Sequence, residues 1–560
     1  MLLLRNLICL AACGSLAAAR QPAHRPVIDL GYEIYQAVEE GNLTKSFYTF
    51  SNIRYAAPPV GDLRWREAVA PHENRAAIQS NPDVITCPQG TPTWQIRTSS
   101  QISGYLDTGI VPNVSFANLT SLVQTGQEDC LFLDVLVPKK VFDHVKNGSK
   151  VPVLVWIHGG GFTTGSKTDF GSPRTLLNRA EEYDEPVIYV ALNYRLGAFG
   201  FLSGPSFASE GGLLNAGLLD QRKALQWIQD NIHRFGGDKG QVTVFGESAG
   251  AGSILHHITS GGGSIEPLFN RAILQSPGYY PYRSTQEKEN AFNLFLGHAN
   301  VTSIADARTI SSETLMTANA ESIGESLPFA SPIYGPTPDG DLVIRDPKVH
   351  LARGEFAHSL EIITAYNSDE GLVNVPTIHT DTEYHSFLEA ILTNTNASTI
   401  AYIADTLYPP TFDGSQGYTN QFQRFAKTAG DLLIDCNSVA AGLAFGSRAR
   451  GYYFSTYPGI HVQDISYTFY NPESKGSYSL VDTGPVNVTV AHVLQDYITG
   501  FARRGEMKSE GDGLERDIPP YSSRGTMVRL DSEGIELIRD PGLSERCQWW
   551  ASGVYNGLSA

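Results

Sequence analysis

The segment Gly246-Glu247-Ser248-Ala249-Gly250 is the sequence feature that most narrows the fold of this chain. It stands between Gln241–Phe245, which alternates like a strand, and Ala251–Ser260, which begins with the small residues of a tight helix start. A strand that turns sharply into a helix needs small neighbours, because the backbone is tight there. Such a turn holds a serine oxygen clear of the fold and aims the free N–H groups of the helix at nearby negative charge. The segment therefore predicts a strand–turn–helix unit with Ser248 at its apex.

Apolar runs of strand length alternate with helical patterns along the chain. Continuous apolar runs suit a sheet that is buried on both faces, and strands that alternate with helices imply a mainly parallel sheet. We therefore predict an α/β fold with a large, mostly parallel central sheet flanked by helices. The runs are Asp129–Pro138, Val151–His158, Pro186–Asn193, Leu360–Tyr366 and Gly451–Tyr457, and the clearest helical pattern is Leu219–Phe235.

The first 19 residues have the pattern of a secretion signal. Arg5 is basic, Leu7–Leu16 is apolar, and Ala17–Ala19 offers a small-residue cleavage site. The apolar run is shorter than the roughly 20 residues of a transmembrane helix, and no later segment is long and apolar enough to span a bilayer. We predict a signal peptide over residues 1–19, a single domain over residues 20–560, and a secreted, extracellular protein.

The cysteines, glycosylation motifs and charge fit that compartment. Outside the signal, the four cysteines form no C-x-x-C pair, so a zinc or redox role is not expected. A net charge of −17 argues against nucleic acid or an anionic membrane as a partner. The sequence does not indicate the oligomeric state. The cysteines are Cys87, Cys130, Cys436 and Cys547, and the predicted glycosylation sites are Asn42, Asn113, Asn118, Asn147, Asn300, Asn396 and Asn487.

Four reactive segments follow predicted strands, at the end of a parallel sheet where active sites gather. The glycines at 159–161 allow main-chain N–H groups to point inward as an oxyanion hole. Ser248 follows the second strand. Asp369 and Glu370 both follow the third, and from the residues alone either carboxylate could orient an imidazole. His461 follows the fourth. The order nucleophile, acid, histidine is that of one class of serine hydrolases.

Two of these segments have an alternative interpretation. The spacing from Gly160 to Gly165 is like that of a phosphate-binding loop, but Ser166 comes next and Lys167 is one position late, so nucleotide binding is not predicted. A loop histidine is often merely solvated, but His461 alone among those after the acid follows a strong strand and a Pro-Gly turn. The histidines set aside are His379, His385 and His492.

Several longer motifs together resemble the type-B carboxylesterase/lipase family, which includes cholinesterases and fungal secreted lipases. They stand in family order from about Ile53 to Trp550, so the resemblance covers nearly the whole chain. The motifs are FGESAGAGS (245–253), EDCLFLDVLVP (128–138), PPVGDLRW (58–65), NYRLGAFGFL (193–202), GLLDQRKALQWI (217–228), SDEG (368–371) and His461-x-x-Asp464.

The resemblance implies an α/β-hydrolase fold and a serine esterase that works through an acyl-enzyme, with no cofactor or metal. It makes Ser248 the nucleophile, His461 the base and Glu370, the second acidic residue of SDEG, the triad acid. The oxyanion donors would be the N–H groups of Gly160, Gly161 and Ala249. The resemblance also implies disulfides Cys87–Cys130 and Cys436–Cys547, and structural salt bridges Arg64–Glu128 and Arg195–Asp220.

Two differences from the cholinesterase sequences limit the range of expected substrates. Those enzymes carry a tryptophan about ten residues before the second cysteine, where this chain has Thr120, and aromatic residues after the acid, where it has Leu372–Asn374. A quaternary ammonium binds on aromatic faces, so we expect neutral esters rather than choline esters. Whether the ester is a small molecule or a lipid stays open.

Two alternative functions are carried forward. The segment from Cys87 to Cys130 is long and rich in Thr, Ser, Gly and Gln, which indicates a surface excursion. In related lipases it forms a lid, so a lipase is the first alternative. A non-catalytic binding or adhesion protein on the same fold is the second, and the intact set of catalytic residues disfavours it.

Overall fold

The computed structural model describes residues 25–556, except 39–46, 111–124, 146, 147, 149, 327–332, 473–480, 510, 512, 515 and 516. The predicted signal peptide and Thr120 lie outside the described residues, as do the glycosylation motifs at Asn42, Asn113, Asn118 and Asn147. Asn300 and Asn396 are exposed and Asn487 is half-buried. None of the described helices is both long and apolar enough to cross a membrane.

A ten-stranded sheet, in the order β13-β12-β11-β10-β9-β8-β6-β7-β5-β3, forms the centre of the described fold. Its strands from β12 to β7 run parallel, and β13, β5 and β3 are each antiparallel to a neighbour. The predicted mostly parallel sheet is confirmed. The strands are β3 (Phe47–Arg54), β5 (Phe132–Pro138), β6 (Val151–Ile157), β7 (Ile188–Leu192), β8 (Gly237–Glu247), β9 (Arg271–Gln275), β10 (Glu361–Asn367), β11 (Ala449–Phe454), β12 (Thr526–Asp531) and β13 (Gly534–Arg539). A separate three-stranded sheet holds β1 (Val27–Asp29), β2 (Glu33–Gln36) and β4 (Asn74–Gln79).

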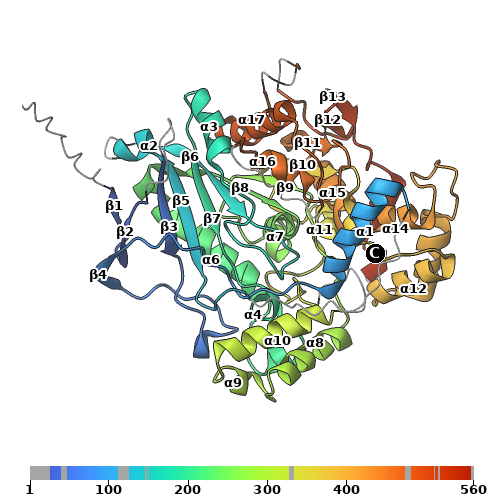
Figure 1. Cartoon of the computed structure of the whole chain (residues 1–560), viewed down its shortest axis with the longest axis horizontal. Helices are drawn as coiled ribbons and strands as arrows, with labels where there is room; N and C mark the ends of the chain where they lie inside the picture. Colours follow the sequence, from blue (N-terminus) through green and yellow to red (C-terminus); the bar gives the residue numbers. More distant parts are fainter. Residues whose placement is uncertain are drawn as a thin grey trace, which may run out of the picture.

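Helices connect the strands and cover both faces of the large sheet (Figure 1). They are α1 (Thr93–Thr108), α2 (Lys139–Asp143), α3 (Arg174–Glu182), α4 (Gly197–Phe201), α5 (Pro205–Ser209), α6 (Ala216–Asn231), α7 (Ala249–Ile258), α8 (Thr285–His298), α9 (Ile304–Ala307), α10 (Ser312–Gly324), α11 (Pro347–Arg353), α12 (Asp381–Ile391), α13 (Ala397–Tyr402), α14 (Gln421–Gly430), α15 (Cys436–Phe445), α16 (Gln463–Thr468), α17 (Val488–Arg504) and α18 (Glu545–Ala551). Short turns include η5 (Glu370–Asn374) and the π-helical η7 (Asp431–Asp435).

Strands β6 and β7 are apolar throughout because their side chains enter two separate cores. Successive residues of a strand point to opposite faces. In β6, Val153 and Val155 join the core that includes residues of α6 and α7, whereas Leu154 and Trp156 join the core that includes residues of α3 and α17. Burial on both faces leaves no polar positions in the strand, which explains why continuous apolar runs identified the sheet.

The segment between Cys87 and Cys130 is not only a surface excursion, and that expectation is wrong for its first half. Residues 93–108 form α1, whose Trp94 and Ile102 are 6% and 1% exposed. The helix packs near η5 and α10. It also lies beside α14 (Figure 1), where the rings of Tyr105 and Phe422 are in contact. The polar composition hid this helix because only a few of its residues enter the core.

Ion pairs and disulfides link distant parts of the chain. Arg64 contacts Glu128 at 2.7 Å and Arg195 contacts Asp220 at 2.6 Å, and both pairs are buried, so the expected structural salt bridges are confirmed. The disulfides join Cys87 to Cys130 and Cys436 to Cys547. The second pair ties the first turn of α15 to α18, across a separation of 111 residues.

Loss of the Cys436–Cys547 disulfide should destabilise the fold more than loss of Cys87–Cys130. A cross-link stabilises by closing a loop in the unfolded chain, and the loops span 111 and 43 residues. The chain-entropy relation gives about 5 and about 4 kcal/mol. Denaturant unfolding of the two Cys→Ser double variants, against wild type, measures the order. An unchanged unfolding midpoint in the Cys436→Ser/Cys547→Ser variant would contradict the expectation.

Candidate active site

Ser248 occupies the sharp turn between β8 and α7. Its backbone has φ 54° and ψ −124°, a conformation that non-glycine residues rarely adopt and that must be held by its surroundings. Its N–H donates to the carbonyl of Gln275 at 3.0 Å, and its own carbonyl accepts from Gly252 and Gly278 at 2.8 and 2.9 Å. These main-chain bonds fix the serine between β8, α7 and the end of β9.

The glycines on either side of Ser248 are required by close backbone contacts. A Cβ atom on Gly246 would lie 2.6 Å from the carbonyl oxygen of Ile157, and one on Gly250 would lie 2.1 Å from the same atom. Real Cβ atoms do not approach this closely. The G-x-S-x-G pattern is therefore dictated by the packing of the turn against the end of β6.

His461 lies within hydrogen-bond distance of the serine. Its Nε2 is 2.9 Å from Ser248 Oγ. The histidine follows β11 and is 7% exposed. The side-chain oxygen of Gln463 accepts from the N–H groups of Gly459 and Ile460 and so fixes the turn that precedes His461. The serine and the histidine that the sequence singled out thus lie side by side.

Glu370, not Asp369, lies against His461. Glu370 Oε2 is 2.6 Å from His461 Nδ1, and Glu370 Oε1 accepts from Ser276 Oγ and the N–H of Asn367, each at 2.5 Å. Asp369 is exposed and its carboxylate accepts from Ser368 Oγ. Both acidic residues line a cavity of about 500 Å³ that does not contain Ser248. The geometry therefore favours one of the two carboxylates that the sequence left open.

The predicted oxyanion donors line the cavity that contains Ser248. Gly160 and Gly161 have φ of 108° and 60°, values that glycine adopts at no steric cost. Within the described part of the chain, neither of their N–H groups donates to another protein group. Ala249 is the first residue of α7, where a helix leaves its N–H groups unpaired. All three residues line the same cavity as Ser248.

That cavity, of about 190 Å³, contains Ser248 and His461 and is walled mainly by apolar and aromatic side chains. The walls come from segments far apart in the sequence. Trp94 and Gln95 belong to α1, Tyr279 and Tyr280 follow β9, and Leu433 and Ile434 lie in η7. Such a pocket, with few polar groups, suits a small organic ligand.

The pocket has aromatic walls, although the two places compared with the cholinesterases carry no aromatic residue. Val373 and Asn374 line the cavity, whereas Leu372 lines the larger cavity. Other elements, however, bring aromatic rings to the pocket, namely Trp94, Phe162, Phe170, Tyr279 and Tyr280. The comparison with cholinesterases considered only two aligned places and therefore missed rings that arrive from elsewhere in the fold.

Comparison with known proteins shows which family the chain belongs to. The sequence profile described as "Carboxylesterase family" matches residues 35–550. The chain belongs to the carboxylesterase family. It is 35% identical to carboxylesterase patB of Aspergillus clavatus, over 95% of this chain and 97% of that one. It is also 32% identical to lipase 1 of Geotrichum candidum, over 72% and 75% of the two chains.

Solved esterase structures have the same fold. Aspergillus niger EstA superposes with a TM-score of 0.76 at 24% identity, over 95% of this chain and 99% of that one. A thermophilic PNB esterase gives 0.73 at 25% identity, over 94% and 100%. The family match makes carboxylic ester hydrolysis the activity of this chain. The structural likeness confirms its α/β-hydrolase fold.

Glu247 is a further ionisable residue at the site, which the sequence reasoning did not single out. It is 1% exposed, and its Oε1 lies 3.4 Å from His461 Nε2. Among the described residues this oxygen has no hydrogen-bond partner. Burial raises the pKa of Glu247 to about 8, although the nearby His461 opposes the shift. The sequence could have pointed to Glu247, because it lies inside the G-x-S-x-G segment, directly before the nucleophile.

Glu247 should set the acidic limb of the pH profile in this carboxylesterase. Burial lowers the pKa of His461, but the carboxylates of Glu247 and Glu370 outweigh it and raise that pKa to about 9. The base form of His461 is the active one, so kcat/KM should rise with pH through this pKa. Glu247→Gln removes a negative charge and should move the limb to lower pH, by about one unit or more.

The pH profile of kcat/KM for an uncharged ester, across the acidic to alkaline range, measures this shift. Glu389→Gln, at an exposed position of α12, is the matched control and should leave the limb in place. A limb that does not move in Glu247→Gln would show that this carboxylate does not act on the His461 imidazole.

Proposed function

We propose that the protein is a secreted serine carboxylesterase that hydrolyses neutral carboxylic esters through an acyl-enzyme. The observation that carries the proposal is the continuous chain of contacts from Ser248 Oγ to His461 and on to Glu370, at 2.9 and 2.6 Å. Nucleophile, base and orienting acid in hydrogen-bond contact are the arrangement of a catalytic triad.

In the proposed mechanism His461 removes the proton of Ser248, whose Oγ attacks the ester carbonyl. The N–H groups of Gly160, Gly161 and Ala249 stabilise the oxyanion. His461 then protonates the leaving alcohol, and a water molecule releases the acid by the same steps in reverse. Glu370 fixes the imidazole tautomer and stabilises the imidazolium that forms in each half-reaction. No step requires a metal or a cofactor.

Secretion is supported by three features. The first 19 residues have the signal pattern, and the chain has two disulfides, which are typical of oxidising compartments. A relative from Arthroderma benhamiae, 30% identical over 74% of this chain, is described as a secreted lipase. Amino-terminal sequencing of protein from the culture medium tests the cleavage after Ala19. Retention in the cell with an intact leader would contradict it.

Neutral esters should be hydrolysed at least as well as choline esters with the same acyl group. Aromatic rings line the cavity, but Glu247 is the only carboxyl among the described lining residues, and burial raises its pKa to about 8. Its Oε1 lies 3.4 Å from His461 Nε2, so the imidazole competes with a quaternary ammonium for the charge of this carboxyl. The comparison is kcat/KM for butyrylcholine against a neutral butyrate ester. A tenfold preference for the choline ester, about 1.4 kcal/mol, would exclude this selectivity.

A p-nitrophenyl ester series of increasing acyl length tests the esterase function and separates it from the lipase alternative. An esterase should act on dissolved esters of short and medium chains, with no gain at an oil–water interface. The lipase alternative is supported by the relatives from Geotrichum candidum and by α1 at the edge of the cavity. A sharp rise in rate at the interface would favour the lipase, and hydrolysis of no ester would favour the binding protein.

A further inference from the structure

A buried pair of ionisable residues lies behind the catalytic cavity without lining it. Asp346 caps the N-terminus of α11 and is 2% exposed, and Lys348, two residues later, is 1% exposed. Neither belongs to the cavity wall. Burying a carboxylate and an ammonium costs free energy unless both are paired and hydrogen-bonded. Their partners therefore show what the pair holds in place.

Asp346 holds Tyr279, a residue of the cavity wall, through the tyrosine hydroxyl. Its Oδ1 accepts from the hydroxyl of Tyr279 at 2.7 Å and its Oδ2 accepts from the hydroxyl of Tyr555 at 2.5 Å. Tyr279 lines the cavity, and the residue before it, Gly278, donates its N–H to the carbonyl of Ser248. The backbone just before the tyrosine is therefore held by the nucleophile residue, and the hydroxyl of the tyrosine is held by Asp346.

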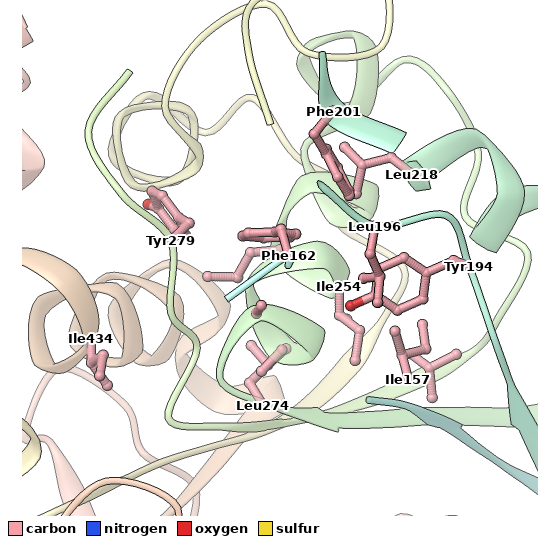
Figure 2. Close-up of a cluster of buried hydrophobic side chains, with 14 of the residues drawn as sticks. Ile157, Phe162, Tyr194, Leu196, Phe201, Leu218, Ile254, Leu274, Tyr279 and Ile434 are labelled. Carbon is pink, nitrogen blue, oxygen red and sulfur yellow. The ribbon is translucent and has the colours of Figure 1, made fainter. Parts of the chain in front are cut away.

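Lys348 holds a second wall. Its Nζ donates to the carbonyl of Leu432 at 3.1 Å and lies 3.8 Å from Asp346 Oδ2. The same Nζ stands 5.3 and 5.2 Å from the ring centres of Tyr279 and Tyr555, a cation–π distance. Leu432 belongs to the π-helical turn η7, whose next residues, 433 and 434, line the cavity. Figure 2 shows Tyr279 and Ile434 on separate segments of the chain.

We propose that Asp346, Lys348 and Tyr555 are positioning residues that set the ester-chain selectivity of the catalytic cavity by holding Tyr279 and η7. Tyr555 lies near the C-terminal end of the chain. The hydroxyl of Thr395 donates to its carbonyl, which helps to fix this segment beside Asp346. The inference rests on the proposed esterase function. A purely structural pair would affect stability and leave substrate preference unchanged.

Tyr555→Phe is the sharpest test, because it removes one hydroxyl and keeps the ring. The matched control is Tyr521→Phe, whose hydroxyl also donates to a buried aspartate, Asp540, at 2.5 Å, and which does not line the cavity. For each protein, kcat and KM are measured on p-nitrophenyl acetate and octanoate, with active sites titrated by a fluorophosphonate. Tyr555→Phe should change the octanoate-to-acetate ratio of kcat/KM at least fivefold, mainly through KM. Tyr521→Phe should leave it within twofold.

A second variant removes the charges together. Asp346→Asn/Lys348→Met keeps the side-chain volumes and leaves no single buried charge, and it should change the ratio in the same direction. If this variant does not fold, Tyr555→Phe decides alone. A fully titrated Tyr555→Phe protein with the wild-type ratio would overturn the inference. Wild-type protein that reacts with the fluorophosphonate but hydrolyses neither ester would instead overturn the proposed function.

Discussion

Replacing Ser248 by alanine should lower ester turnover by roughly 10⁴- to 10⁶-fold, because triad members act as a unit and the loss of one removes the shared advantage. The substitution deletes only the Oγ atom, which contacts His461 at 2.9 Å, and leaves the main-chain bonds of the turn intact. The unfolding temperature should therefore stay close to that of wild type. Turnover of a p-nitrophenyl ester and thermal unfolding, measured on the same preparation, test both statements.

Labelling provides the control for this prediction. A fluorophosphonate should modify wild-type protein at one serine in stoichiometric amount and should not modify Ser248→Ala. Ser253 is a useful comparison, because it is also in α7 but is fully buried, with its hydroxyl donating to the carbonyl of Ala249. The Ser253→Ala variant should still be labelled by the fluorophosphonate, at Ser248. Stoichiometric labelling of Ser248→Ala would show that the nucleophile is a different residue.

Replacing Glu370 by glutamine should lower kcat by about 10³- to 10⁴-fold. The carboxylate fixes the imidazole tautomer and stabilises the imidazolium, and an amide in its place favours the wrong tautomer. The carboxylate of Glu370 is 1% exposed and contacts His461, Ser276 and Asn367, so its charge is held at short range. Steady-state kinetics at the pH optimum measure the loss.

Asp369→Asn is the matched control, since it makes the same chemical change one residue away. Asp369 is exposed, and its carboxylate accepts from Ser368 rather than from His461. Its substitution should cost less than tenfold in kcat. The reverse ranking of the two variants would assign the acid to Asp369 and would require the loop at η5 to rearrange during catalysis.

The sheet and the reactive groups could be predicted because local sequence fixes them. Strands such as β6 and β7 are buried on both faces and are therefore apolar without interruption. The Ser248 turn needs glycines on both sides, because the backbone of β6 lies within contact distance. Close backbone contacts require glycine, and strands buried on both faces require apolar residues. Both patterns can be recognised in the sequence without knowledge of the fold.

The pocket walls follow no such pattern. Trp94, Tyr279 and Ile434 lie far apart in the sequence and meet only in the folded chain. The choice between Glu370 and Asp369 rested on resemblance, because adjacent carboxylates differ only in the direction their side chains take. Glu247 was overlooked for a related reason. Its burial against His461 depends on how β8 packs, and the residue type alone does not show it.

The distribution of the cavity walls separates the chemistry of this enzyme from its substrate preference. The nucleophile turn is confined by backbone contacts on both sides, so its residues can change very little. Trp94, Tyr279 and Ile434, by contrast, stand on three connections that leave the sheet, each able to vary in length and composition without disturbing a strand. Descendants of this sequence can therefore diverge in substrate by exchanging one connection at a time, with the reaction itself inherited unchanged.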